Sequence, residues 1–258
     1  MPSRNQNEPR LHHRCVLSLG LLGLLLGCAN PELPTATAQE PMSAALADWS
    51  ARELPGKLST QYSMAHRDGQ ACVLAKASKS VSLWRRPLKI DPEQIAGLQF
   101  DWWIQTLDLR ASVLDPDTDD APARLLLGFD GDESRLSMRN RMQFELVQTL
   151  TGEAPPFATL MYVWDANAAA ETMLISSRSD RIRKIVVGSG EGGRGRWQRL
   201  RRDVRADYIK AFGEAPGKLS SMALMTDGDN TGSRAEACYG SILLLGADQQ
   251  ALQGSLKF

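Results

Sequence analysis

The sequence predicts a mostly β protein, a jelly-roll-like β-sandwich with two or three short helices. Seven or more short apolar segments are each bounded by Gly, Pro, Asp or Asn, as β-strands usually are. The few segments with helical periodicity do not alternate regularly with these strands. A parallel sheet with crossover helices is therefore the weaker alternative.

The predicted strand at residues 98–107 has the clearest pattern. Its apolar and polar side chains alternate, so that one face holds Leu98, Phe100, Trp102 and Ile104 and the other holds Gln99, Asp101, Trp103 and Gln105. The other predicted strands lie at residues 71–77, 124–129, 159–164, 181–187, 221–225 and 238–245. In the strand at 159–164 we expect Tyr162 and Trp164 to join the core.

Helical spacing predicts the helices, which lie at residues 42–52, 137–150 and 203–212. The second helix has one apolar stripe, formed by Met142, Leu146, Val147 and Leu150. The second and third helices are followed by Gly152 and Gly213, which are typical residues for ending a helix.

The N-terminus has the pattern of a bacterial lipoprotein signal. An apolar run at residues 16–26 follows a basic segment, and Leu25 and Gly27 precede Cys28 as in a lipobox. We therefore expect cleavage before Cys28 and acylation of its thiol and its new amine, which together hold a protein durably on a membrane. The run is shorter than the roughly 20 residues that span a bilayer. The alternative is a plain secretory signal in which Cys28 is incidental.

These features divide the chain into a signal peptide at 1–27, a flexible tether at 28–42, a single β-sandwich domain at 43–248 and a C-terminal tail at 249–258. The tether is rich in Pro, Thr and Ala and has almost no large apolar residue. The residue after Cys28 is Ala29 and not an aspartate. In enteric bacteria this choice favours sorting of a lipoprotein to the outer membrane. We therefore expect a lipid-anchored protein of the bacterial cell envelope that faces the periplasm.

Charge and cysteine content narrow the function. Loss of residues 1–27 removes three arginines and one glutamate from 30 basic and 30 acidic residues, which leaves 27 and 29 and a net charge of −2. Nucleic acid is therefore not an expected partner, because its binding needs a basic surplus. Only Cys72 and Cys238 remain unmodified, and in an oxidising compartment they most simply form a disulfide. The alternative is two buried free thiols.

The sequence motifs do not identify any catalytic residue. His66 is the only histidine after the signal, which excludes two-histidine metal sites, and no Gly-x-Ser-x-Gly motif accompanies it. The glycine-rich segment 188–195 lacks the Lys-Ser/Thr of a phosphate loop, and we interpret it as a long hairpin loop. Carboxylate-dependent glycosidase chemistry stays open, because Asp and Glu are plentiful, although no pair of them stands out.

The polar segment 226–232 is a candidate calcium site. Asp227, Asp229 and Asn230 supply oxygen ligands within one tight turn, as calcium requires. The alternative is an Asx-rich turn whose side chains bond their own backbone amides.

The polar face of the strand at 98–107 is a candidate sugar-binding surface. Trp103 offers a ring for the C–H face of a sugar, and Asp101 and Gln105 beside it can bond hydroxyl groups. A helix or loop that covers Trp103 is the alternative. The arginine-rich segment 194–205 either meets lipid phosphates or anionic glycan, or it is a solvated strand face.

Several blocks of the chain resemble, in order and spacing, a bacterial family known as domain of unknown function 3047. They include Leu98-Gln-Phe-Asp-Trp-Trp103, Leu160-Met-Tyr-Val-Trp164, Ile185-Val-Val-Gly-Ser-Gly190 and Met225-Thr-Asp-Gly-Asp-Asn-Thr-Gly232. The resemblance covers residues 45–246 and implies an exported β-sandwich that is like carbohydrate-binding modules. It supplies no catalytic residue. The acidic insert at 115–120 and the paired cysteines depart from the family pattern.

The leading functional hypothesis is therefore a non-enzymatic lipoprotein that binds an envelope glycan or another envelope component. The first alternative is a carboxylate-dependent enzyme that acts on glycan, and a cleft with two carboxylates about 5–10 Å apart would favour it. The second is a structural partner in an envelope assembly, which an exposed apolar patch would favour. An aromatic face without a carboxylate pair would favour binding.

Overall fold

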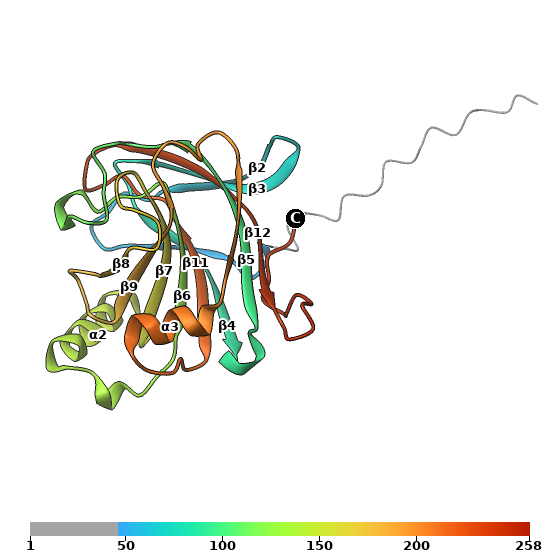
Figure 1. Ribbon diagram of the computed structural model, residues 1–258. Coiled ribbons are helices and arrows are strands. Elements are labelled where there is room, and N and C mark those ends of the chain that lie inside the picture. The colour runs from blue at the N-terminus through green and yellow to red at the C-terminus, as the bar shows by residue number, and fades with distance from the viewer. Residues whose placement is uncertain (1–45) are drawn as a thin grey trace, which may run out of the picture. The chain divides into compact units, whose positions relative to one another are not determined.

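The computed structural model describes residues 46–258, which form two β-sheets with short helices beside them (Figure 1). The predicted signal peptide, Cys28 and the tether lie outside the described residues. None of the helices in the described part is long and apolar enough to cross a membrane.

The larger sheet has seven strands in the order β1-β4-β11-β6-β7-β9-β8. Its neighbours are antiparallel except for β7 and β9, which are parallel. The strands of this sheet are β1 (Ser50–Glu53), β4 (Ser82–Ile90), β11 (Leu219–Met225), β6 (Ala123–Phe129), β7 (Ala158–Asp165), β9 (Ile182–Ser189) and β8 (Met173–Ile175).

The smaller sheet has five antiparallel strands in the order β10-β5-β12-β3-β2. They are β10 (Trp197–Arg202), β5 (Gly97–Thr106), β12 (Arg234–Leu245), β3 (Gln70–Ser78) and β2 (Gln61–Arg67). Two sheets that enclose one core confirm the prediction of a mostly β sandwich.

Aromatic side chains join the inner faces of the two sheets. The Phe100 ring of β5 stacks on Tyr162 of β7 at a centroid distance of 5.7 Å. Trp102 meets Trp164 edge-on at 6.4 Å. The alternation in the strand at 98–107 and the core position of Tyr162 and Trp164 are thus as predicted, because all four rings are buried.

Helix α3 (Val204–Phe212) lies at one end of the two sheets (Figure 1). Asp203 caps its N-terminus by accepting a hydrogen bond from the Ala206 amide, and Gly213 ends it in the left-handed conformation with φ of 71°. Tyr208 packs edge-on against Phe129 of β6 at 4.7 Å. The third predicted helix is therefore confirmed within one residue.

Helix α2 (Met138–Thr151) lies beside β8 and β9 (Figure 1) and is confirmed in extent, but its apolar stripe faces solvent. Met142, Leu146 and Leu150 are 64%, 58% and 59% exposed. The half-buried Phe144 packs on the core, and polar contacts hold the helix beside it, because the amide of Asn140 donates to Asp180 at 2.5 Å and that of Gln143 donates to the Arg178 carbonyl at 2.7 Å.

Two local predictions were wrong, one at the end of a helix and one about the type of a loop. Residues 50–52 were expected at the end of a helix, but they belong to β1, whose backbone pairs with β4. The segment 188–195 was expected as a hairpin loop, but β9 and β10 belong to different sheets, so it crosses between them. Three short 3₁₀ turns complete the described elements, at Pro92–Gln94, Pro116–Thr118 and Glu133–Arg135.

The C-terminal segment 249–258, expected as a tail, packs on the domain. Leu256 is fully buried and forms an antiparallel bridge with Ile242 of β12, and Ala251 bridges to Leu245. This segment therefore extends the core.

A disulfide links Cys72 of β3 to Cys238 of β12, as predicted, with the two Cα atoms 5.7 Å apart. These strands are neighbours in the smaller sheet, although 166 residues separate the cysteines in the chain. The bridge lies on the outer face with Leu74, Trp103 and Trp197 around it.

Reduction of this disulfide should lower the free energy of unfolding by about 4–5 kcal/mol, because the bridge closes a long loop in the unfolded chain. Urea unfolding with and without reductant measures the difference. The Cys72→Ala/Cys238→Ala variant should have the same free energy of unfolding as the reduced protein, and reductant should not change it. Equal urea midpoints for oxidised and reduced protein would contradict the prediction.

Candidate functional site

A groove of about 410 Å³ lies on the outer face of the seven-stranded sheet. Strands β4, β11, β6, β7 and β9 form its floor, and the C-terminal end of α2 with the following residues 153–156 forms its wall. Its size is within the range of small-ligand sites in proteins. It combines aliphatic side chains on its floor with a cluster of charged side chains.

The floor is a row of apolar side chains that the strand register brings side by side. Ala223 of β11 pairs with Leu126 of β6, and Leu126 pairs with Met161 of β7. The next residues in this row are Arg85 of β4 on one side and Lys184 of β9 on the other. The groove therefore has an aliphatic middle between two cationic ends.

Gly128 allows the wall to approach the floor. A Cβ atom at this position would lie 2.6 Å from Cγ of Pro156 and 2.5 Å from Oγ of Ser221. Glu153, three residues before Pro156, accepts hydrogen bonds from Arg52 of β1 at 2.9 Å and from Arg85 at 2.8 Å. The segment after α2 is thus attached across the groove to the far strands of the sheet.

A buried ion pair stands at the charged end of the groove. Arg124 of β6 binds the carboxylate of Asp227 through Nε at 3.1 Å and through Nη2 at 3.0 Å, and both side chains are at most 3% exposed. Burial opposes the charge on Arg124, but Asp227 and Asp119 outweigh it and raise the pKa of Arg124. Burial also raises the pKa of Asp227 to about 6, against the attraction of Arg124.

Lys184 extends this network. Its Nζ donates to Asp119, whose other carboxylate oxygen accepts from Arg124 at 3.1 Å. Burial, and then the charge of Arg124, lower the pKa of Lys184. Among the described residues, Lys184 Nζ makes this one hydrogen bond and Arg124 Nη1 makes none. The end of the groove therefore holds two cationic side chains whose remaining donors have no described acceptor and line the groove.

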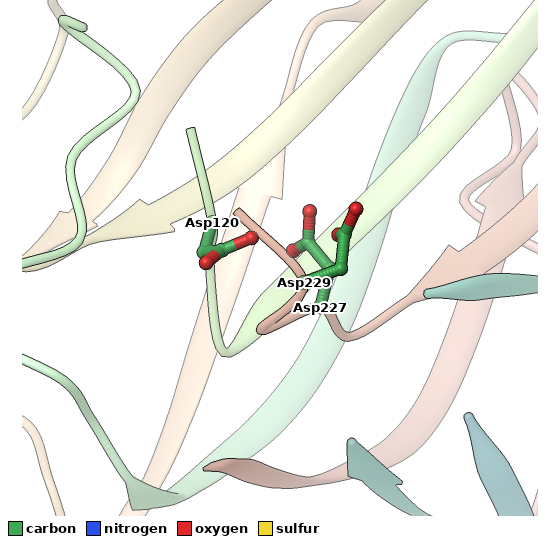
Figure 2. A group of neighbouring side chains, drawn as sticks. All are labelled: Asp120, Asp227 and Asp229. Carbon is green, nitrogen blue, oxygen red and sulfur yellow. The ribbon is translucent and has the colours of Figure 1, made fainter. Parts of the chain in front are cut away.

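The predicted calcium residues are only partly brought together. Carboxylate oxygens of Asp227 and Asp229 lie within 4.8 Å of each other and of a third carboxylate, that of Asp120 (Figure 2). The side-chain amide of Asn230 instead donates to the Pro116 carbonyl at 2.9 Å. Sequence reasoning did not include Asp120, which lies on a different loop.

Each of these three carboxylates already has donors from the protein. Besides Arg124, Asp227 accepts from the Ala121 amide at 2.9 Å. Asp229 pairs with Lys57 at 2.5 Å, and Asp120 accepts from the Thr231 amide at 2.6 Å. Among the described residues, neither Asp227 nor Asp229 accepts from a backbone amide of its own turn, so the bonding runs between separate segments and is not that of the expected Asx-rich turn. It also places the carboxylates of Asp227 and Asp229 beside the groove, which both residues line.

The predicted sugar surface at Trp103 lies on the opposite side of the sandwich, on the outer face of the smaller sheet. Trp103 is half-buried, its ring meets Trp197 edge-on at 5.9 Å, and its Nε1 donates to Gln105 at 3.2 Å. Asp101 is buried and paired with Arg199, whose Nε lies 3.0 Å from it. The structure therefore brings Trp103 and Gln105 together, and it engages Asp101 elsewhere.

The arginines of segment 194–205 bond mainly to the chain itself. Arg202 pairs with Asp207 of α3 at 2.8 Å and with Glu171 at 2.6 Å. Arg194 and Arg199 pair with Glu191 and Asp101. These contacts agree with an ordinary strand face rather than with a free cationic patch.

Sequence reasoning missed the groove and its cations Arg124 and Lys184. One signal was present, because β6 contains the run Leu125-Leu126-Leu127, and a strand that is apolar on both faces must be covered on both. An arginine at the start of such a run, and a lysine within the apolar β9, were the second signal, since buried charges require partners.

Comparison with known proteins places the chain in a family. A family model described as "Protein of unknown function (DUF3047)" matches residues 47–243. The chain belongs to this family. The match includes the groove floor, the loop at 226–232 and both cysteines of the disulfide. No curated protein matches the chain.

Two solved structures illustrate the similarity in fold. One is the family 11 carbohydrate-binding module from Clostridium thermocellum in complex with a β-1,3-1,4-mixed-linked tetrasaccharide, with 8% identity over 76% of this chain and 86% of that chain and a TM-score of 0.37. The other is the family 11 xylanase from Neocallimastix patriciarum, with 11% identity over 75% of this chain and 97% of that chain and a TM-score of 0.32.

We predict that calcium does not stabilise the protein through Asp227 and Asp229, because protein donors already occupy these carboxylates. Thermal unfolding with calcium and with chelator should give the same melting temperature. Asp229→Ala should lower the free energy of unfolding by up to about 1 kcal/mol in both conditions, through loss of the Lys57 pair. A calcium-dependent rise in melting temperature that Asp229→Ala abolishes would contradict this.

Proposed function

We propose that this protein is a lipid-anchored lipoprotein of the bacterial cell envelope whose β-sandwich binds an envelope glycan in the groove, without catalysis. The observation that carries the proposal is the charged end of the groove, where Arg124 and Lys184 line a cavity of about 410 Å³ with hydrogen-bond donors that no described acceptor takes. Because these donors line the groove, a ligand hydroxyl can accept from them.

The charge balance at this end favours a neutral ligand rich in hydroxyl groups. Lys57, Arg124 and Lys184 are paired with Asp119, Asp227 and Asp229, so cations and carboxylates offset one another. An anion would meet the carboxylates as well as the cations. A sugar hydroxyl both donates and accepts, and it can bond the amine of Lys184 and a carboxylate oxygen of Asp229 together.

Catalysis by carboxylates in the same groove is the second candidate function. It is favoured by Asp227, whose pKa of about 6 is that of a general acid, and by the nearby carboxylate of Asp229. Against it, both oxygens of Asp227 are bonded to Arg124, so no free proton donor faces the groove. Incubation of the purified protein with the glycan that it binds decides between binding and catalysis. Hydrolysis would release new reducing ends, and Asp227→Asn would abolish that release.

A structural role in an envelope assembly is the third candidate. It is favoured by exposed apolar surface on α2, where the side chains that face solvent are Met138, Met142, Leu146 and Leu150. Glutamine substitutions at Met142 and Leu146 separate this role from binding in the groove. They should release an assembly partner and leave glycan affinity unchanged.

The binding prediction is tested on a glycan array with the chain from Ala29 onward, which contains every described element. Lys184→Met should weaken binding to the selected glycan by about 10- to 100-fold, the loss expected for a hydrogen bond from a charged donor. Titration calorimetry measures the Kd of each variant.

Two controls locate the site. Lys218→Met removes a half-exposed lysine that pairs with Asp91 at 3.3 Å and does not line the groove, so it should leave the Kd unchanged. Trp103→Ala should also leave it unchanged. Loss of glycan binding in Trp103→Ala alone would move the site to the smaller sheet and overturn its assignment to the groove.

The anchor is tested at Cys28. Labelled palmitate should be incorporated into the wild-type protein and not into Cys28→Ser, because the thiol is the acylation site. Cys28→Ser should also leave the membrane fraction. Equal labelling of the two proteins would show that the anchor proposal is wrong.

A further inference from the structure

We infer that the glycan bound in the groove carries an aliphatic chain, so that the ligand is an acylated glycan whose sugar lies at the charged end and whose chain lies along the floor. The inference rests on the proposed function of the groove and adds the chemical class of its ligand. It follows from the composition of the floor, the wall and the two ends.

The groove has no platform for a sugar ring beyond its charged end. None of the described residues that line it is aromatic. Sugar rings are commonly held by stacking on such rings, which present a broad flat apolar face. A second or third sugar along this floor would leave its hydroxyl groups against aliphatic side chains, and unpaired polar groups are unfavourable there.

The middle of the groove suits a chain of methylene groups instead. Ala223, Leu126 and Met161 lie side by side in the floor, with Leu83 and Met225 in the adjacent row. Adjacent strands are about 4.8 Å apart, so the row from Arg85 to Lys184 extends over about 19 Å. The wall continues this surface with Val147 of α2 and with Ala154, Pro155 and Pro156.

The ends of the groove give the ligand a direction. At the Lys184 end the donors of Lys184 and Arg124 remain partly unused. At the other end Arg85 and Arg52 are both bonded to Glu153, and the one Arg52 donor that lacks a partner, Nε, is buried. Polar ligand groups therefore find partners at the Lys184 end, and the aliphatic part lies between the ends.

The occupant is thus complementary to the groove in both polarity and charge. A neutral sugar matches the balanced cations and carboxylates, and the aliphatic chain matches the uncharged row of Ala223, Leu126 and Met161, next to which Arg124 is paired with Asp227. Each methylene group that leaves water for such a surface should tighten binding by about fourfold.

The experiment uses hexyl, octyl and decyl maltosides below their micelle concentrations, with maltose and a decanoate salt as the two half-ligands. Titration calorimetry is carried out on the chain from Ala29 onward. We expect the Kd to fall as the alkyl chain lengthens, and both half-ligands to bind at least tenfold more weakly than decyl maltoside.

Two variants separate the two parts of the ligand. Ala223→Phe fills the middle of the floor and should abolish the dependence of the Kd on chain length. Lys184→Met should weaken every alkyl maltoside by a similar factor and keep the dependence on chain length. If Ala223→Phe does not fold, Met161→Ser, at a half-buried position of the same floor, should weaken the dependence.

The outcomes distinguish this inference from the proposed function. One outcome is that Lys184→Met weakens the binding of a glycan while the Kd of the alkyl maltosides does not change with chain length. This result would overturn the inference of an acylated ligand and leave the proposal of glycan binding intact. Decanoate that binds as tightly as decyl maltoside would overturn both, because the sugar would then contribute nothing.

Discussion

The ion pair between Arg124 and Asp227 is the interaction on which both the sandwich and its groove depend. It joins β6 to the loop after β11, and its members are almost completely buried. The backbone amide of Arg124 also donates to the hydroxyl of Tyr239, which belongs to the other sheet. Loss of one partner from such a pair usually costs about 3–5 kcal/mol, because a buried charge is then left uncompensated.

The same ion pair organises the charged end of the groove. Because Arg124 bonds Asp119 as well as Asp227, it positions the carboxylate that receives Lys184. Lys184 is thereby kept under the groove instead of extending into solvent, at a place where burial disfavours its charge. A lysine buried where its charge is disfavoured is consistent with the ligand that we propose for the groove.

The main elements could be predicted because their patterns are local. The alternation around Trp102 and the glycine after Phe212 depend on neighbours in the chain, and the disulfide was predicted from the two cysteines left in a chain that we expect to be exported. Short edge strands such as β1 could not be predicted in this way. Their four residues carry no apolar period, and it is pairing with β4 that makes them a strand.

The site was harder to predict because it is built from strands that are distant in the chain. Asp227 and Asp229 were identified as ligand-binding candidates from their spacing, but their actual partners are Arg124 and Lys57, which come from β6 and from the segment before β2. The exposed stripe of α2 shows the same limit. Its periodicity predicted the helix correctly, whereas the helix is held by Asn140 and Gln143, which bond to the loop before β9, and by Phe144, which packs on the core.

The apolar runs of β6 and β7 bear on both the groove and the position of α2, which were the two features that the sequence did not predict. A sandwich strand with one solvated face needs apolar residues only at alternate positions, yet Leu126 and Met161 on the outer face are apolar as well. In the described structure α2 covers this face only in part, through Val147 and the segment that ends at Pro156. Leu126 is 8% exposed and Met161 is half-buried, so the wall leaves this apolar row partly open. The strand pattern and the position of α2 thus meet at the groove, where an aliphatic row lies beside buried charge, and this is the surface to which the proposal assigns an aliphatic ligand.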